Sequence, residues 1–288
     1  MPQLAPHRFT WTRRVSGSTA DDWFQTLAHL GPMRVMVTQN VGSHSAQVQA
    51  HGLTSREAQD LQDAHGGKIS EATWLTKTNP PMRAPIRVRG RFSVVSTEEE
   101  KAAALQKDGK PALWIPAGLA FGTGEHATTA MCLRHLTDIA DTLDSGEWDF
   151  LDLGTGSAIL AMAARVLGAG QVLGTDFDAL ALRTAKENVL NNGLPKVKLI
   201  RSDVLKWTPE RTWEVVAANL FSGVLIEAAP VIAKAVAKGG HLLISGVLRE
   251  QEGEVLAAFA ARKLTLERVT RKGKWISARL RNISTSKH

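Results

Sequence analysis

The feature that most constrains this fold is a glycine loop between a strand pattern and a helical pattern, followed by one acidic residue. Leu151 belongs to the apolar run, Gly154-Thr155-Gly156 form the loop, and Ile159 opens the helix. Asp176 lies 22 residues after Gly154, at the end of the next apolar run. Glycine is required where a ligand comes too close to the backbone for a Cβ, and a carboxylate at this spacing can accept hydrogen bonds from both hydroxyls of a ribose. The pattern predicts a nucleoside-binding site containing Gly154, Gly156 and Asp176.

The same loop favours S-adenosylmethionine over a dinucleotide as the ligand. A dinucleotide site has a third glycine, which lets the helix pack closely while its N-terminus faces a pyrophosphate. This chain has Ile159 at that position, and S-adenosylmethionine carries no phosphates. Asp203, after the following strand, is a candidate to accept the adenine amino group; the alternative is a turn or helix-cap residue.

A polar residue, Asn219, follows the apolar strand pattern of residues 214–218. Ligands of open α/β sheets bind at the carboxyl ends of the strands, so Asn219 is a candidate to hold either a target amine or the methionine end of the cofactor. Enzymes that methylate the exocyclic amines of bases usually have Asn or Asp, then Pro-Pro and an aromatic residue, at this point. Leu220-Phe221 breaks that pattern, so the sequence favours methylation of a base less than it otherwise would.

The segment FGTGEHATT, from Phe121 to Thr129, precedes the helix that leads into the first strand of this sheet. Its two glycines indicate a hinged flap, and Thr129 is able to cap the helix or offer a hydroxyl to the cofactor carboxylate. His126 has no metal-ligand partners at the usual spacing, so we expect no metal site. Either a capping role or that of a general base for an amine remains open for His126.

Residues 1–78 predict a small ferredoxin-like α+β domain. Apolar alternation and helical spacing give the order β-α-β-β-α-β, with a capping box of Thr54 and Glu57 at the second helix. The expected elements are strands near 9–13, 33–37 and 69–75, a further strand that follows a polar turn at 40–43 and runs through residue 48, and helices over 20–30 and from 54 to 66.

A proline-marked linker is expected over residues 79–112, and a second domain over residues 113–288. In that domain strands and helices alternate, which implies a parallel doubly wound sheet. The last two strand patterns, 264–269 and 275–280, have no helix between them and predict an antiparallel hairpin. A parallel sheet closed by such a hairpin is typical of the seven-stranded, Rossmann-like class I methyltransferase domain.

The chain has a formal net charge of +7 and a pI near 9.7. Basic residues gather over 83–91 and again over 262–274. Such segments favour acidic partners such as ribosomal RNA; the alternative is a solvated face that only keeps the protein in solution. The single cysteine, Cys132, lies on an apolar helical face, so we expect it to be a packing residue. A single cysteine allows no internal disulfide, so we expect a reducing cytoplasm. We expect no membrane span and a monomer.

Taken together, the motifs resemble the PrmA family, the lysine methyltransferases of ribosomal protein L11 in the large subunit. The resemblance runs from about residue 113 to the C-terminus and rests on these segments: FGTGEHATT, LDLGTGSAIL, GTDFDALALRTAKENVLNNG, VVAANLFSGVL and KGGHLLISGVL. It implies that the N-terminal domain recognises the ribosomal protein and that Thr129, Gly154, Asp176 and Asn219 contact S-adenosylmethionine. It also implies that the flap from Phe121 to His126 lies near the methyl group.

The chain departs from the family pattern at two points besides its divergent N-terminal half. Pro116-Ala117 stands where the family usually has an acidic residue and proline, and Ala158 stands where the glycine loop usually ends in Gly. A methyl group at Ala158 is tolerable in a helical conformation but would cost roughly 1–2 kcal/mol in a left-handed one. The alternatives to a ribosomal-protein lysine methyltransferase are an RNA methyltransferase, a methyltransferase of another protein, and a non-catalytic protein that kept the fold.

Overall fold

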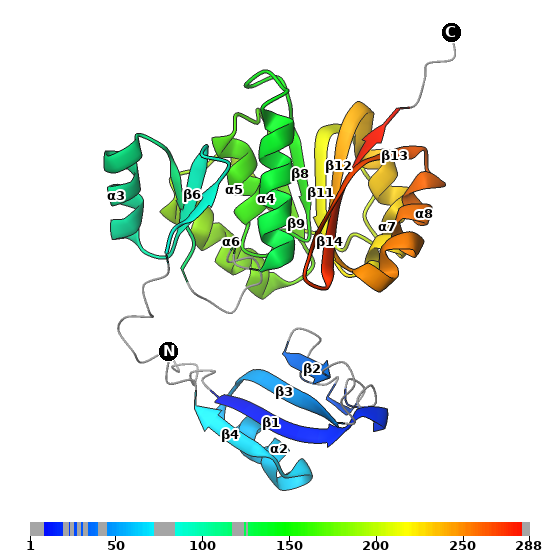
Figure 1. The fold of residues 1–288 in the computed structure, drawn as a ribbon. Helices are drawn as coiled ribbons and strands as arrows, with labels where there is room; N and C mark the ends of the chain where they lie inside the picture. The colour runs from blue at the N-terminus through cyan, green and yellow to red at the C-terminus, as the bar shows by residue number, and fades with distance from the viewer. Residues whose placement is uncertain are drawn as a thin grey trace. The chain divides into compact units, whose positions relative to one another are not determined.

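A computed structural model describes residues 9–19, 23, 26–27, 30, 34–39, 45–71, 84–116, 124 and 126–283 of the 288-residue chain. The chain divides into two compact units, Met1–Met82 and Arg83–His288 (Figure 1). Each unit is described by itself. Among the described residues, none of the helices combines the length and the apolar character needed to cross a bilayer.

The N-terminal unit contains a four-stranded antiparallel sheet and the helix α2. Its strands have the order β2-β3-β1-β4, which is the ferredoxin-like order expected from the sequence. The elements are β1 (Phe9–Ser16), a 3₁₀ turn η1 (Gly17–Thr19), β2 (Val35–Gln39), β3 (Ser45–Leu53), α2 (Ser55–His65) and β4 (Lys68–Glu71). The helix predicted over 20–30 and the end of the strand predicted over 69–75 lie largely outside the described residues.

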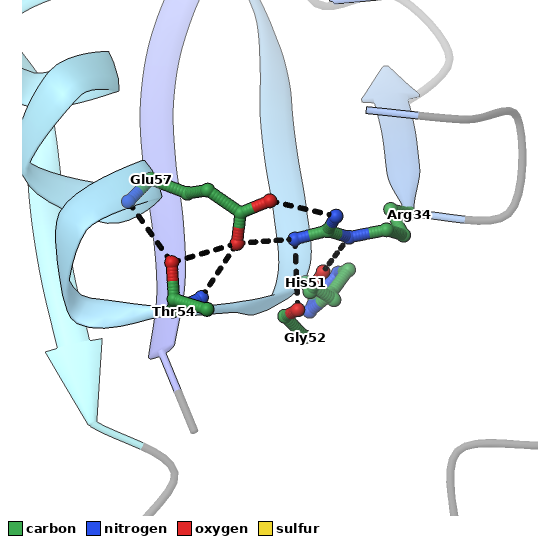
Figure 2. Close-up of polar contacts among 5 residues, drawn as sticks. All are labelled: Arg34, His51, Gly52, Thr54 and Glu57. Carbon is green, nitrogen blue, oxygen red and sulfur yellow. Dashed lines mark hydrogen bonds and ion pairs between the residues drawn. The ribbon is translucent and has the colours of Figure 1, made fainter. Parts of the chain in front are cut away.

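The capping box predicted at α2 is present and is part of a larger polar contact (Figure 2). Glu57 Oε2 accepts from the backbone N–H of Thr54 at 2.7 Å, and Glu57 N–H donates to Thr54 Oγ1 at 3.2 Å. Both carboxylate oxygens also pair with the guanidinium of Arg34 at 3.0 Å. Arg34 donates further to the carbonyls of His51 and Gly52, so one arginine joins the start of β2, the end of β3 and α2.

The C-terminal unit is built on a seven-stranded sheet with the order β10-β9-β8-β11-β12-β14-β13. Its neighbouring strands are parallel except for β14, which runs antiparallel to β12 and β13. The strands are β8 (Phe150–Leu153), β9 (Val172–Asp176), β10 (Val197–Arg201), β11 (Trp213–Asn219), β12 (Val236–Leu248), β13 (Leu264–Lys272) and β14 (Trp275–Asn282). This confirms the predicted class I methyltransferase sheet and its closing hairpin.

Helices cover both faces of this sheet (Figure 1). The buried strand residues alternate between two apolar clusters: Phe150 and Val215 pack with α4, α5 and α6, whereas Leu151 and Val216 pack with α7 and α8. The helices are α4 (Ala127–Ala140), α5 (Ile159–Val166), α6 (Ala179–Asn191), α7 (Ser222–Ala235) and α8 (Glu252–Ala260), with a 3₁₀ turn η4 (Arg249–Gln251) before α8.

Residues 84–116 form a small sheet and a helix at the start of the C-terminal unit. The elements are β5 (Ile86–Val88), β6 (Phe92–Val95), α3 (Glu98–Asp108) and β7 (Ala112–Trp114). Asn192, at the end of α6, accepts from Trp114 N–H and donates to Trp114 O, each at 2.8 Å. These contacts join β7 to the large sheet's helices, so most of the segment expected as a linker, 79–112, groups with the C-terminal unit.

Three further differences from the sequence-based prediction concern the elements from α7 to α8. The sequence Lys238-Gly239-Gly240 predicts that the helix after Ser222 ends there, but α7 ends at Ala235 and β12 begins at Val236. The apolar pattern predicts the next strand over residues 241–245, whereas β12 is longer and pairs with β14 through Leu248. Helix α8 was not predicted at all.

Candidate functional site

The loops that follow three neighbouring strands meet at one edge of the large sheet. Backbone N–H of Gly156, after β8, donates to Asp176 Oδ2, at the end of β9, at 2.9 Å. Gly154 has φ +72°, and a Cβ there would lie 2.4 Å from Leu220 Cδ2, after β11. The left-handed φ favours glycine at this position, and a Cβ would also require the Leu220 side chain to move.

Asp176 is 8% exposed, and both of its carboxylate oxygens accept backbone hydrogen bonds. Oδ2 accepts from Gly156 and Oδ1 accepts from Asp178 N–H at 3.0 Å. The next loop also lies here, because Ser202 N–H donates to the Asp176 carbonyl at 2.9 Å. The structure therefore brings together the glycine loop and the predicted ribose carboxylate, and it places the Asp203 loop beside them.

The Asp203 carboxylate is engaged locally. Oδ1 accepts from the backbone N–H of Leu205 at 3.0 Å, and Lys206 Nζ lies 3.9 Å from Oδ2. These contacts fit the turn-residue alternative. The side chain is 39% exposed, so it is also accessible to a ligand.

Two buried side-chain oxygens at this edge have no hydrogen-bond partner among the described residues: Thr129 Oγ1 and Asn219 Oδ1. Thr129 lies in the first turn of α4 and is 1% exposed; Asn219 is the last residue of β11. A buried polar atom without a partner costs about 1–3 kcal/mol, so such atoms are uncommon unless a ligand completes them. A polar ligand at this edge would supply the missing hydrogen bonds.

His126 lies at the N-cap position of α4, but its side chain makes no capping hydrogen bond. Its Nδ1 lies 2.7 Å from Thr128 Oγ1, and its ring packs edge-on against Trp275, with centroids 5.1 Å apart. Burial and the charge of Lys274 lower the pKa of His126. A lowered pKa favours the neutral imidazole, which is the form that can accept a proton.

Most of the flap lies outside the described residues, including Phe121. Gly124 is described: a Cβ on it would lie 3.3 Å from Ile159 Cδ1 and 3.3 Å from Ile86 Cδ1. Its φ of +90° is a left-handed value that favours glycine. Gly124 thus lies close to the first residue of α5, next to the glycine loop.

Ala158 adopts a left-handed conformation, with φ 64° and ψ 19°, at the N-cap of α5. It is fully buried. The departure from glycine noted in the sequence therefore falls at a strained position, where a Cβ costs about 1–2 kcal/mol.

Sequence reasoning missed Asp152, a buried carboxyl on β8. Thr155 Oγ1 donates to its Oδ2 at 2.6 Å, and burial raises its pKa to about 7. The signal was available, because Asp152 is the one acidic residue of an otherwise apolar strand that leads into the glycine loop.

Cys132 is fully buried, its Sγ lies 3.8 Å from Ser277 Oγ, and burial raises its pKa to about 12. A thiol with this pKa stays protonated, as expected of a packing residue. In the described part of the chain, no group of three or more His, Cys, Asp or Glu residues is arranged to hold a metal ion.

Curated proteins include relatives that are similar to this chain. A ribosomal protein L11 methyltransferase of Syntrophotalea carbinolica is 42% identical over 163 residues, which are 57% of this chain and 52% of the relative. Another, of Geobacter sulfurreducens, is 41% identical over 214 residues, 74% of this chain and 68% of the relative. The matched region thus spans little more than half of the first relative and about two thirds of the second.

A crystal structure of a ribosomal protein L11 methylase from Lactobacillus delbrueckii subsp. bulgaricus has the same fold. It aligns with a TM-score of 0.61 at 24% identity, over 69% of this chain and 98% of that chain. The family model described as ribosomal protein L11 methyltransferase (PrmA) matches residues 28–282. This match confirms the resemblance inferred from the motifs: the chain belongs to the ribosomal protein L11 methyltransferase (PrmA) family.

Proposed function

We propose that this protein transfers methyl groups from S-adenosylmethionine to lysine side chains, and to the N-terminal amine, of ribosomal protein L11. The observation that carries the proposal is the contact between the glycine loop and Asp176, with Gly156 N–H 2.9 Å from Asp176 Oδ2. The names of the curated relatives support the same substrate.

The cofactor fits the residues at the sheet edge. In this proposal Asp176 accepts hydrogen bonds from the ribose hydroxyls, and Gly154 and Gly156 let the ligand approach the backbone. Thr129 Oγ1 and Asn219 Oδ1, buried without described partners, bind the polar groups of the methionine end. Asp203 accepts from the adenine amino group in exchange for part of its local contacts. The cofactor supplies a methyl group on a positively charged sulfonium.

The task of the protein is then to present a neutral amine in line with that methyl group. Lysine has a pKa near 10.4 in water, and removal from water together with a nearby positive charge lowers it. Asn219 and the backbone around it would orient the amine, while Phe121 of the flap would exclude water. Orientation alone can supply several kcal/mol, so a strong base is not required. His126, whose pKa is lowered, is the candidate that could accept a proton.

The proposed substrate also suggests where the protein acts and what else it contacts. We propose that the protein acts in the cytoplasm as a monomer, that the N-terminal unit binds the ribosomal protein, and that basic surface residues contact ribosomal RNA. The chain's net charge of +7 supports the RNA contact.

A methyl-transfer assay tests the substrate class. Purified protein and methyl-labelled S-adenosylmethionine are incubated with large-subunit ribosomal proteins in one reaction and with ribosomal RNA in another. We expect label on one ribosomal protein, the size of L11, and its loss when that substrate is first acetylated on its amines. Label confined to RNA would replace this proposal with the RNA methyltransferase alternative, and label on a different protein would change the substrate.

A further inference from the structure

The two basic segments of the sequence meet on helix α4 of the C-terminal unit. Arg89, in the turn between β5 and β6, donates from Nη2 to Asp138 Oδ2 at 2.8 Å. Arg268, on β13, places Nη1 4.0 Å from the same oxygen. Asp138 is thus shared by arginines from opposite ends of this unit's sequence, which the fold brings to one place.

Strand pairing adds two more arginines. Arg268 pairs directly with Arg279 of β14, although like charges at such positions repel. Glu267 lies in the irregular register between Leu266 and Arg268, and its carboxylate is 2.8 Å from Arg279 Nε and 3.6 Å from Arg281 Nη1. We call Arg89, Arg134, Arg268, Arg279 and Arg281 the arginine cluster.

Positive charge exceeds negative charge in this cluster. Asp138 and Glu267 face four of the arginines, and Arg134 has no ion pair within the part of the chain that the structure describes. Arg134 lies one helical turn before Asp138 on the exposed stripe of α4. The side chains of Arg89, Arg268 and Arg281 are 44%, 56% and 48% exposed, so a ligand can reach them.

The buried side chain of His135 experiences the charges of the cluster. It is 3% exposed, and neither ring nitrogen has a hydrogen-bond partner among the described residues. Burial, followed by the charges of Arg268 and Arg279, lowers the pKa of His135 to about 4 against the opposite effect of Asp138. The two carboxylates therefore leave positive charge that an external anion could balance.

We propose that the arginine cluster binds the phosphate backbone of double-stranded RNA. The planar guanidinium matches a phosphate with paired hydrogen bonds, and arginine is the preferred residue for this contact. The exposed large aromatic side chains among the described residues, Phe177 and Phe221, lie outside α4, β13 and β14, so the cluster lacks the stacking platform that single-stranded nucleic acid requires. A contact limited to phosphates is sequence-independent and falls steeply with salt.

The cluster is separate from the candidate cofactor site. Asp138 lies twelve residues after His126, which is about 18 Å along α4. The inference extends the proposed RNA contact to a defined surface and does not depend on methyl transfer. RNA binding and cofactor binding can therefore fail independently.

Two matched triple variants test the proposal. One removes cluster charges (Arg89→Gln, Arg134→Gln and Arg268→Gln); the other removes the same charge from exposed residues of α6 and β10 (Arg183→Gln, Lys186→Gln and Lys198→Gln). Fluorescence anisotropy measures binding of a short RNA hairpin over a range of salt. We expect the cluster variant to bind RNA at least about tenfold more weakly than the original protein. Its salt slope should be smaller by about one for each lost phosphate contact. The control variant should stay within about twofold of the original.

Each contrary outcome is decisive. Equal weakening of RNA binding in both variants would mean that net charge alone attracts the RNA. Unchanged RNA binding in the cluster variant would show that the arginine cluster does not bind RNA. If a polyglutamate peptide competes as well as RNA, the partner is an acidic protein and the proposal is wrong. Arg134→Gln alone breaks no described ion pair and should lower the salt slope by about one, so it settles the question if the triple variant does not fold. Cofactor affinity, measured alongside, should be unchanged.

Discussion

The backbone N–H of Gly156 lies 2.9 Å from Oδ2 of Asp176 and donates a hydrogen bond to it. The other carboxylate oxygen accepts from Asp178 N–H at 3.0 Å. A carboxylate oxygen has two acceptor positions, so one on each oxygen remains for a ligand. The glycine loop thus orients the acid before any ligand binds, and the end of β9 and the loop after β8 act as one structural unit.

Replacement of Ala158 by glycine should reveal the strain in the loop. Ala→Gly at a buried helical position costs about 1 kcal/mol in propensity and about 0.8 kcal/mol for the lost methyl group. At Ala158 relief of about 1–2 kcal/mol of left-handed strain offsets that loss. We expect Ala158→Gly to be nearly neutral in chemical denaturation.

The matched control for that variant is Ala161→Gly, at an equally buried position within α5. Ala161→Gly should lower the free energy of unfolding by about 2 kcal/mol. Equal destabilisation by the two substitutions would contradict a strained Ala158.

Thr129→Val should separate ligand binding from stability. Valine keeps the shape of threonine and removes a buried hydroxyl that has no described partner. Without ligand the variant should be as stable as the original or more so, by up to about 1 kcal/mol, whereas its affinity for S-adenosylmethionine should fall about tenfold. Thermal melts with and without the cofactor measure both quantities.

The control on the same helix is Thr137→Val. Thr137 Oγ1 donates to Leu133 O at 2.8 Å, so this substitution removes a satisfied hydrogen bond away from the site. Its cofactor affinity should match that of the original protein. A normal affinity in Thr129→Val would remove Thr129 from the proposed site.

Asp152 should make stability fall as the pH rises. Burial raises its pKa from 3.8 to about 7, so between these values the folded state holds a proton that the unfolded state has released. This contribution is complete below about pH 4 and is lost as the pH rises to about 7. Asp152→Asn, which mimics the protonated form, should gain stability relative to the original protein across this window. The exposed Asp144→Asn should show no such trend, and parallel pH profiles for Asp152→Asn and the original would refute the role of burial.

The contact between Arg34 and Glu57 should stabilise the N-terminal unit at neutral pH, and this stabilisation should be lost in acid (Figure 2). Hydrogen bonds from Arg34, then those from Thr54, lower the pKa of Glu57 to about 2 against the opposing effect of burial. A lowered carboxyl pKa stabilises the fold above the unfolded value of 4.5, and this stability is lost as the pH falls towards 2.

Glu57→Gln should therefore destabilise this unit at pH 7 by about 1 kcal/mol, the usual value of a helix cap. Hydrogen exchange of residues 45–65, followed by mass spectrometry, measures the change without separating the two units. Glu71→Gln, at the exposed end of β4, serves as the control. Unchanged exchange in Glu57→Gln would show that the contact adds nothing to stability.

Elements with strong local signals could be predicted from the sequence. The regular apolar spacing of residues 179–191 predicts a helix with these bounds, and α6 has them, with Asp178 as its N-cap. The capping box of Thr54 and the glycine loop were predicted for the same reason, because each depends on residues that are close together in the sequence. The juxtaposition of Asp176 with that loop followed from parallel strand order.

Features that depend on tertiary packing could not be predicted. The left-handed conformation of Ala158 is imposed by the loop geometry, and the raised pKa of Asp152 is caused by burial. Asn192 joins β7 to α6, so the expected linker became part of the C-terminal unit. The arginine cluster is formed by strands and turns distant in sequence. The predicted roles of Phe121 and of most of the flap lie outside the described residues.

The most direct test of the account is calorimetric titration of S-adenosylmethionine into the original protein, Asp176→Ala and Asp178→Asn. Asp178 lies two residues from Asp176 and caps α6, and asparagine keeps that cap. Hydrogen bonds to a charged group contribute about 1.5–3 kcal/mol each, so Asp176→Ala should bind at least about tenfold more weakly. Asp178→Asn should bind like the original protein. Equal affinity in Asp176→Ala, or no binding by the original protein, would contradict the proposed cofactor site.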